Sequence, residues 1–248
     1  MKRTRGVIRR KRVPAVDPRL RSNQILWRYL DLAKLLDFLK YGRLYFERGD
    51  KFTDKFEGTF TESVRLEIIK SYKDNDINFT YEEFKKRLRE RVYVNCWHRG
   101  PDDNMAMWTI YGGSSPSVAI TSTVGKLKEA LEKADLSHFV SIQKVSYIRH
   151  WRDPKIDINP YSKIFAYKVR AYDYEKELRA IIDRVEEDFD SGKMESGMYV
   201  TVSRSQLLRS IVISPEAPIW FRKLIREIIQ DYDLDVDIHK SRLDTLPI

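Results

Sequence analysis

Three charged residues are spaced two apart in the segment Glu175-x-Glu177-x-Arg179, late in the chain. In a β-strand, residues two apart point to the same face and lie about 7 Å from each other. The apolar neighbours Leu178 and Ile181 predict a buried strand, and carboxylates that share a buried site shift each other's pKa, as catalytic groups do. The alternative is an exposed strand, on which Glu177 and Arg179 form a surface ion pair worth at most about 1 kcal/mol.

Two other segments carry side chains that could hold a ligand. Thr121-Ser122-Thr123 ends a predicted strand with three hydroxyls, which can hydrogen-bond a sugar or phosphate but which at such positions also cap a following helix. Trp108 and Tyr111 fall three apart on one face of a predicted helix, where they either stack on a ligand or pack in the core.

The sequence does not predict a metal site made of histidine and cysteine. His98 follows Cys96 by two residues, but Cys96 is the single cysteine and the other three histidines lack ligand spacing. Asp54 and Glu57 could bind magnesium through their carboxylates, although Asp54 in its aromatic loop more simply closes an Asx-type turn. Neither common glycine-rich phosphate loop is present, which argues against a P-loop nucleotide triphosphatase or a Rossmann dehydrogenase.

The composition favours one domain preceded by a basic arm. The chain has 248 residues, of which 42% are hydrophobic, enough for one core. Residues 1–22 hold nine basic residues against one acidic residue, whereas the rest is close to neutral. We therefore expect a disordered arm over residues 1–22 and a single domain over residues 23–248. The arm could bind RNA or DNA or an acidic partner, or it could be a solvated tail.

The chain shows no secretory signal and no apolar run of the roughly 20 residues that a membrane span needs, so we expect a cytoplasmic protein without a membrane partner.

Strand and helix signals alternate irregularly along the chain. This irregularity predicts an α+β fold, in which helices flank a mixed, mostly antiparallel sheet. A hairpin is expected to join the strand at 175–182 to a strand at 198–202. The other expected strands are 26–30, 43–46, 92–97, 118–122, 140–148, 211–213 and 234–238, and the expected helices are 32–39, 60–72, 80–90, 105–111, 124–134 and 214–232.

Several of these segments, in this order, resemble domain-of-unknown-function family 2971, a bacterial family without an established reaction. The resemblance covers residues 25–240 and leaves out the basic arm. The motifs that carry it are Leu26-Trp27-Arg28-Tyr29, Phe52-x-Asp54-x-Phe56-Glu57, Cys96-Trp97-His98, Met107-Trp108-x-x-Tyr111, Ala119-Ile120-Thr121-Ser122-Thr123, an aromatic stretch with Lys168 and Arg170, and Glu175-x-Glu177-x-Arg179.

A second resemblance, to mono-ADP-ribosyltransferases, suggests a fold and a substrate. These enzymes present an arginine on an early strand, a hydroxyl-rich strand start and a later Glu-x-Glu pair, an order that Arg28, the hydroxyls of residues 121–123 and the Glu175 segment follow. The resemblance implies an ADP-ribosyltransferase-like fold with NAD as substrate. Arg28, with Tyr29 and Arg179, would bind the dinucleotide.

The same resemblance assigns roles to the remaining candidates. Tyr111 or Trp108 would stack on nicotinamide, and Glu177 would stabilise the positive charge that develops on the ribose as nicotinamide leaves. Glu175 would position the acceptor. Replacing Glu177 with Gln is then expected to abolish nicotinamide release with the melting temperature nearly unchanged.

We therefore expect a bacterial effector or toxin of a defence-type system that cleaves NAD and modifies a macromolecule, with RNA or DNA favoured by the basic arm. An antitoxin or sensor protein is the expected regulatory partner. One alternative is a non-catalytic module that binds nucleic acid or protein, in which Arg28, Arg179 and the two late glutamates satisfy one another. Another is a magnesium-dependent nuclease that uses Asp54, Glu57 and Glu177.

Overall fold

The strand that carries Glu177 and Arg179 of the acidic motif lies between two other strands in the interior of the protein. In the computed structural model, strand β9 (Glu177–Asp183) is buried along its whole length. It pairs in antiparallel fashion with β4 (Val92–Arg99) on one side and with β6 (Phe139–Lys144) on the other. The structure describes residues 13–54, 56–113, 116–134, 136–149, 156–188, 192 and 194–244.

A ten-stranded mixed sheet is built around this centre, in the order β1-β6-β9-β4-β2-β5-β11-β12, with β3 and β10 on a branch. Two of its neighbouring pairs, β1–β6 and β11–β12, are parallel and the others are antiparallel, so the predicted α+β class with a mostly antiparallel sheet is confirmed. The remaining strands of this sheet are β1 (Ala15–Val16), β2 (Ile25–Leu30), β3 (Arg43–Arg48), β5 (Val118–Thr123), β10 (Gly197–Thr201), β11 (Ser210–Ile213) and β12 (Asp237–Lys240).

The sheet divides at β4. Strand β2 pairs with the last two residues of β4, His98 and Arg99, whereas β3 pairs with Tyr93 and Val94 near its start. Because each edge residue of a strand accepts one neighbouring strand, β2 and β3 must diverge from the same edge of β4. We call the space between them the fork.

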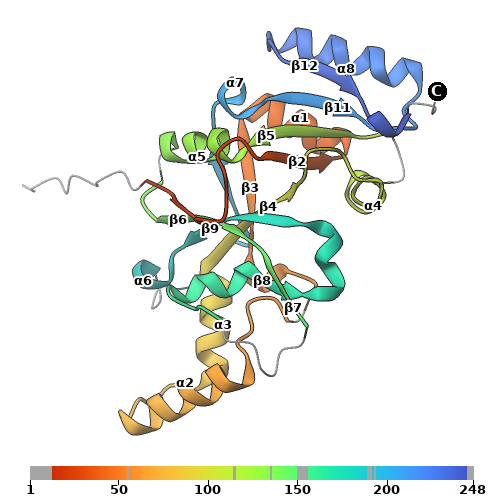
Figure 1. The fold of residues 1–248 in the computed structure, drawn as a ribbon. Helices are drawn as coiled ribbons and strands as arrows, with labels where there is room; N and C mark the ends of the chain where they lie inside the picture. The colour runs from red at the N-terminus through yellow and green to blue at the C-terminus, as the bar shows by residue number, and fades with distance from the viewer. Residues whose placement is uncertain are drawn as a thin grey trace, which may run out of the picture.

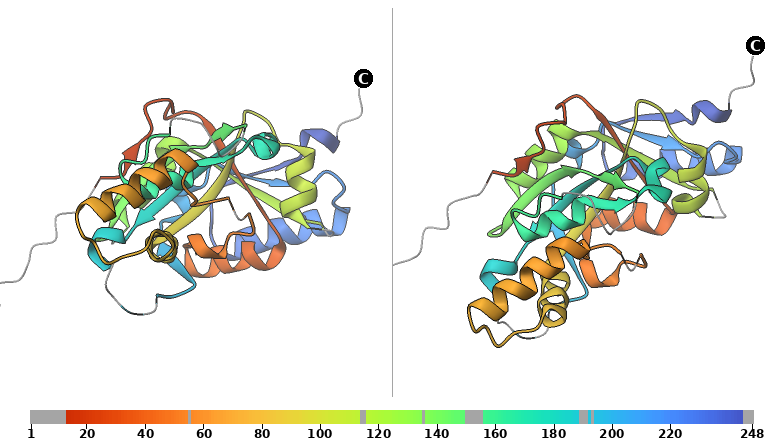
Figure 2. Two further views of the ribbon diagram at one scale, coloured as in Figure 1. Left: turned by 90° about the horizontal axis from the view of Figure 1, so that it is seen from below. Right: turned by 60° about the horizontal axis from the view of Figure 1, so that its bottom comes forward.

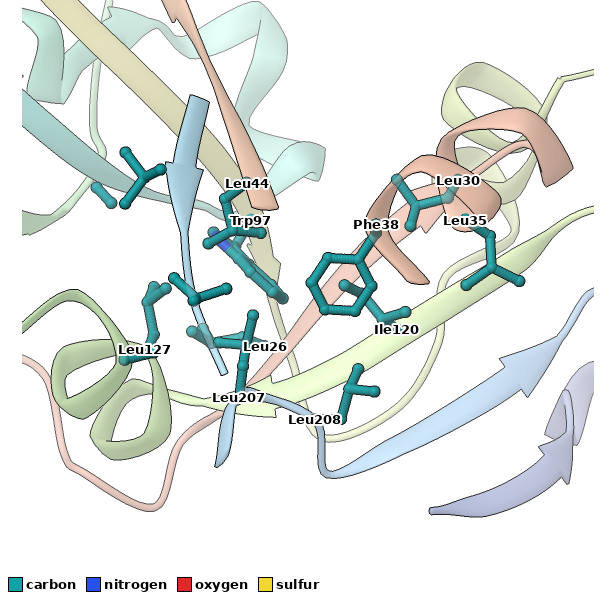
Figure 3. Close-up of a cluster of buried hydrophobic side chains, with 14 of the residues drawn as sticks. Leu26, Leu30, Leu35, Phe38, Leu44, Trp97, Ile120, Leu127, Leu207 and Leu208 are labelled. Carbon is teal, nitrogen blue, oxygen red and sulfur yellow. The ribbon is translucent and has the colours of Figure 1, made fainter. Parts of the chain in front are cut away.

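Helices cover the sheet in two groups. Helix α1 (Leu32–Tyr41) links β2 to β3 and shares the larger core with α5 (Val124–Lys133) and α8 (Ile219–Asp231). Figure 3 shows Leu35 and Phe38 of α1 directed toward Ile120 of β5, with Trp97 of β4 near Leu44. Helices α2 (Glu62–Asp74) and α3 (Tyr81–Arg91) enclose the smaller core at the opposite end of the molecule from α8 (Figures 1 and 2).

Short elements complete the fold. A two-stranded parallel sheet joins β7 to β8, and 3₁₀ turns surround β8. The short strands, helices and turns are β7 (Ser146–Ile148), β8 (Tyr167–Val169), α4 (Met105–Met107), α6 (Val185–Asp188), α7 (Arg204–Leu207), a π-helical turn η2 (Trp108–Gly112), and the 3₁₀ turns η1 (Gly49–Lys51), η3 (Tyr161–Ala166), η4 (Arg170–Glu175) and η5 (Arg242–Asp244).

Local sequence signals correctly predict several helix boundaries. Gly42 ends α1 with φ of 58°, and Thr80 with Glu83 forms the capping box expected before α3. The hairpin prediction is wrong, because β10 pairs with β3 and not with β9. The last long helix starts at Ile219, after the turn that Ser214 and Pro215 form.

The arm expected over residues 1–22 falls in two parts. Residues 1–12 lie outside the described residues. Residues 15 and 16 form β1 beside β6, and the Asp17 carboxylate binds Arg19 at 2.6 Å, so residues 13–22 belong to the domain. In the described ranges, no helix has the length and apolarity needed to cross a membrane.

Two glycines let the loop between β3 and α2 wrap around the buried ring of Phe165. A Cβ on Gly49 would lie 2.4 Å from that ring, and one on Gly58 would lie 2.5 Å from it. Gly58 also has φ of 68°, in the left-handed region that favours glycine. This close packing holds the Glu57 segment against the strands that carry the acidic motif.

Replacing Gly49 with Ala should destabilise the protein by about 1–3 kcal/mol, because the fully buried Phe165 ring would have to shift to make room for the added Cβ. Urea denaturation measures this loss. The matched control is Gly192→Ala, where an added Cβ meets no atom within 4 Å. Equal stability of both variants would show that the loop does not depend on this contact.

Candidate functional site

The acidic motif belongs to a buried cluster of five charged side chains. The Lys168 ammonium lies 2.5 Å from Glu175 Oε2, 2.8 Å from Glu177 Oε1 and 3.3 Å from Glu57 Oε1. Arg179 Nε lies 2.6 Å from Glu177 Oε2, and Arg179 Nη1 lies 3.0 Å from Glu57 Oε2. Three carboxylates therefore surround two cations, and we call this group the ion cluster.

Four separate segments supply the ion cluster. Glu57 comes from the glycine-bounded loop, Lys168 from β8, Glu175 from the end of η4 and the remaining two residues from β9. The sequence prediction that Glu175 shares a strand with Glu177 is wrong: Lys176 adopts a left-handed conformation, with φ of 42°, and β9 begins only after it. The two carboxylates meet because both bind the Lys168 ammonium.

The ion cluster carries one more negative than positive charge when every member is ionised. Burial raises the pKa of Glu175 to about 7, aided by a hydrogen bond with Glu177 and by the charge of Glu177. Burial opposes ionisation of Glu177 as well, but the charge of Arg179 outweighs it and holds the pKa of Glu177 well below its usual range. Near neutral pH, Glu175 is thus the group that gains or loses the surplus proton.

Arg28 projects into the fork without a carboxylate partner among the described residues. Its guanidinium nitrogens contact the carbonyl oxygens of Cys96 at 3.4 Å and Tyr45 at 3.5 Å, which are long for hydrogen bonds. Burial lowers the pKa of Arg28, yet a guanidinium stays charged at neutral pH. A half-buried cation with weak contacts is a ready site for an anion.

A pocket of about 440 Å³ joins Arg28 to the ion cluster. A second pocket of about 570 Å³ continues from it between α1 and β3. Arg28, Leu30, Lys34 and Tyr45 line both, so the fork holds one cleft with an inner and an outer chamber.

The inner chamber combines charged with aromatic side chains. Tyr111 lines it and donates a hydrogen bond from its hydroxyl to Glu175 Oε1 at 2.8 Å. His98 Nδ1 lies 2.7 Å from the backbone oxygen of Glu175, and burial lowers the pKa of His98, so this imidazole is neutral at pH 7. Tyr29 also lines this chamber, beside His98.

Eight of the candidates from the sequence line this inner chamber, namely Arg28, Tyr29, Glu57, His98, Tyr111, Lys168, Glu177 and Arg179. Glu175 reaches the same group through Lys168 and Tyr111. Trp108 is instead buried in a small core, edge-on to Tyr29 with ring centroids 4.8 Å apart. It does not line the chamber, so Tyr111 is the aromatic side chain of that helical segment at the cleft.

The hydroxyl motif lies outside the cleft. Thr121 and Ser122 are fully buried and bind Ser210 and the Leu207 carbonyl, and Thr123 caps α5 by accepting from the Lys126 N–H. The capping alternative for Thr123 is therefore confirmed. These side chains fasten β5 to its neighbours and do not contact the site.

Two more candidates have local roles. Asp54 Oδ1 accepts from the Phe56 N–H at 2.9 Å, which is the Asx-type turn expected from the sequence, and Asp54 does not line the cleft. Arg170 is exposed and lies 3.8 Å from Asp173. Within the described ranges, no group of three or more His, Cys, Asp or Glu side chains is placed to hold a metal ion.

Other residues of the site were not found from the sequence. Tyr147 accepts the Glu177 N–H through its hydroxyl at 2.8 Å, and Tyr45 lies where the two chambers meet. Glu47 also lines the inner chamber, where burial and the charge of Glu57 raise its pKa. Alternation along β3 puts Tyr45 and Glu47 on one face, but only the pairing of β3 with β4 shows that this face meets the cleft.

Comparison with protein-family models, with curated proteins and with solved structures finds no match to this chain.

Glu175 should make the stability of the protein fall as pH rises from about 4.5 to about 7. In this window the folded protein keeps a proton on Glu175 that the unfolded chain has released, because the pKa is raised by folding. Glu175→Gln removes this effect, so its stability relative to wild type should increase with pH by up to about 3 kcal/mol. Urea denaturation at several pH values measures the difference. Exposed Glu227→Gln is the control, and an identical pH profile for Glu175→Gln and wild type would contradict the assignment.

Proposed function

We propose that this protein cleaves NAD in the cleft and transfers the ADP-ribose part to an acceptor, in the manner of ADP-ribosyltransferases. The observation that carries the proposal is that Arg28, Tyr111 and Glu177, which come from distant parts of the chain, line one chamber. A guanidinium, an aromatic ring and a carboxylate are the groups that a phosphate, a nicotinamide and a developing ribose cation require.

The shape of the cleft supports a dinucleotide as substrate. Its two chambers meet at Arg28, as the two nucleosides of NAD meet at a pyrophosphate. The outer chamber is bordered by Tyr45 and Tyr199, with ring centroids 5.2 Å apart, and by Arg43, whose guanidinium lies 3.7 Å from the Tyr199 centroid. Aromatic rings and a guanidinium group at the border of a pocket can hold flat, polar rings.

The buried charges also favour a catalytic role. Five charged groups out of water carry a large desolvation cost, and a buried ion network adds little stability compared with a well-packed apolar one. We therefore expect the surplus negative charge of the ion cluster to contribute more to the binding of a cationic partner than to the stability of the fold. The nicotinamide riboside of NAD is such a partner.

The proposed reaction uses this charge directly. The bond between nicotinamide nitrogen and ribose C1 breaks, and its electron pair leaves with nicotinamide, so positive charge develops on the ribose. Glu177 stabilises that charge. The acceptor then forms a bond to C1, and its proton passes by way of the Tyr111 hydroxyl, which lines the chamber, to ionised Glu175, whose pKa of about 7 suits a general base.

A protein with this activity would consume NAD and modify cell components, which suits an effector or toxin controlled by an antitoxin or sensor partner. The alternative function is a binding module without chemistry, and the mutual pairing within the ion cluster favours it. Incubation with NAD separates the two functions, because only the enzyme releases nicotinamide.

Glu177→Gln should lower nicotinamide release at least a hundredfold, because the neutral amide does not stabilise the ribose cation. Unlike the expectation from sequence, the structure predicts a lower melting temperature too, since Arg179 and Lys168 lose a buried ionised partner. Release is therefore assayed well below the melting temperature, with folding checked by circular dichroism. Full activity in the folded variant would remove Glu177 from the mechanism.

Arg28→Gln should raise KM for NAD about tenfold or more with little loss of stability, because Arg28 contacts a substrate phosphate in the proposal but forms no ion pair within the described protein. Initial rates at increasing NAD concentration measure the effect. Arg209→Gln, at an exposed position outside both chambers, is the matched control. An unchanged KM in Arg28→Gln would exclude the phosphate contact.

A further inference from the structure

A second hollow, of about 400 Å³, lies outside the cleft, and four of its eight lining residues are cations. We call it the basic hollow. Arg19, Lys144, Arg149 and Arg170 contribute four positive charges from three segments of the chain, and Asp173 is the single acidic residue among its lining residues.

One of these cations is held firmly in place. Arg19 donates to both carboxylate oxygens of Asp17, to the Ser146 hydroxyl at 3.0 Å and to the Lys144 carbonyl at 3.1 Å. Even with Asp17 and Asp173 counted against the four cations, the hollow keeps a net positive charge. A fixed guanidinium at its edge requires little reordering when an anion binds.

The basic hollow is connected to the ion cluster through Tyr147. Tyr147 lines the hollow, and its hydroxyl accepts the Glu177 backbone N–H at 2.8 Å. The neighbouring Val145 N–H donates to the Glu177 carbonyl at 3.1 Å. In addition, η4 begins at Arg170, in the hollow, and ends at Glu175, in the cluster. The basic hollow and the ion cluster are therefore linked by two hydrogen bonds to the Glu177 backbone and by η4.

We infer that the basic hollow binds the phosphates of a single-stranded nucleic acid. Four cations and one tyrosine ring in the same hollow match a strand that offers repeated phosphates and flat bases. The further assignment of this strand as the acceptor rests on the proposed function. Binding itself does not require the reaction.

The test is fluorescence anisotropy with the full chain and labelled single-stranded RNA and DNA of about 20 nucleotides, without NAD, at several salt concentrations. The variant Arg149→Glu/Arg170→Glu should bind about tenfold more weakly. The slope of log binding constant against log salt concentration should also become smaller by about 1.4, because each lost phosphate contact removes about 0.7 from it. Lys223→Glu/Arg226→Glu, at two exposed positions on α8, makes the same change in net charge and should bind within about twofold of wild type.

Three results would overturn the inference. The first is an unchanged affinity in the hollow variant, and the second is an equal loss in both variants, which would reflect net charge alone. The third is displacement of the oligonucleotide by polyglutamate as effectively as by unlabelled RNA, which would make the hollow a site for acidic protein segments.

Nicotinamide release without nucleic acid separates this inference from the proposed function. The hollow variant should keep that release, because the inner chamber is intact, while it loses transfer to the oligonucleotide. If wild type releases no nicotinamide but binds the strand through the hollow, the proposed function fails and the binding inference stands.

Discussion

The shared edge of β4 is the constraint on which the site depends. A backbone edge forms one ladder at each residue, so β2 at one end and β3 at the other cannot stay side by side. Between these two ladders, side chains make the hydrogen bonds at the edge of β4: Asn95 donates to the Tyr45 carbonyl at 2.7 Å, and Arg28 contacts the Cys96 carbonyl. A polar cleft in the middle of a sheet follows from this pairing pattern.

On its other edge, β4 positions the acidic residues. Its full ladder with β9 sets His98 opposite Glu177 and Cys96 opposite Arg179, on the same face. The register therefore fixes which charged side chains look toward the cleft, because a shift of one residue would turn them into the larger core. The hydrogen bonds on the two edges of β4 thus determine both the fork and the position of the ion cluster.

Much of the fold could be predicted from the sequence, because its signals are local. The periodic leucines and terminal glycine of α1, the capping box of α3 and the aromatic, β-branched run of β4 each depend on neighbouring residues. The pairing of β10 with β3 depends on tertiary packing, and the expected hairpin was wrong for that reason. No local pattern distinguishes a hairpin from a strand that crosses to another partner.

The residues of the site likewise divide into those that local sequence signals could identify and those that depend on tertiary packing. The acidic motif and Arg28 stood out by residue type, whereas Lys168 as a bridge between three carboxylates depends on the meeting of β8 with two distant segments. The left-handed Lys176 explains why Glu175 left the predicted strand face yet remained in the cluster. The prediction that Thr121 and Ser122 could bind a ligand was wrong, because buried hydroxyls that join strands belong to the same residue types as hydroxyls that bind ligands.

Helix α1 connects the two strands that diverge at the fork, and its inner face is embedded in the larger core through Leu35, Phe38 and Leu39. It therefore works as a fixed brace: the arms of the fork cannot spread without pulling these side chains into water. We therefore expect the distance between β2 and β3, and with it the width of the cleft, to change little when a molecule binds. A cleft of fixed width admits molecules that are thin enough to enter it without moving the strands, and it excludes bulkier ones.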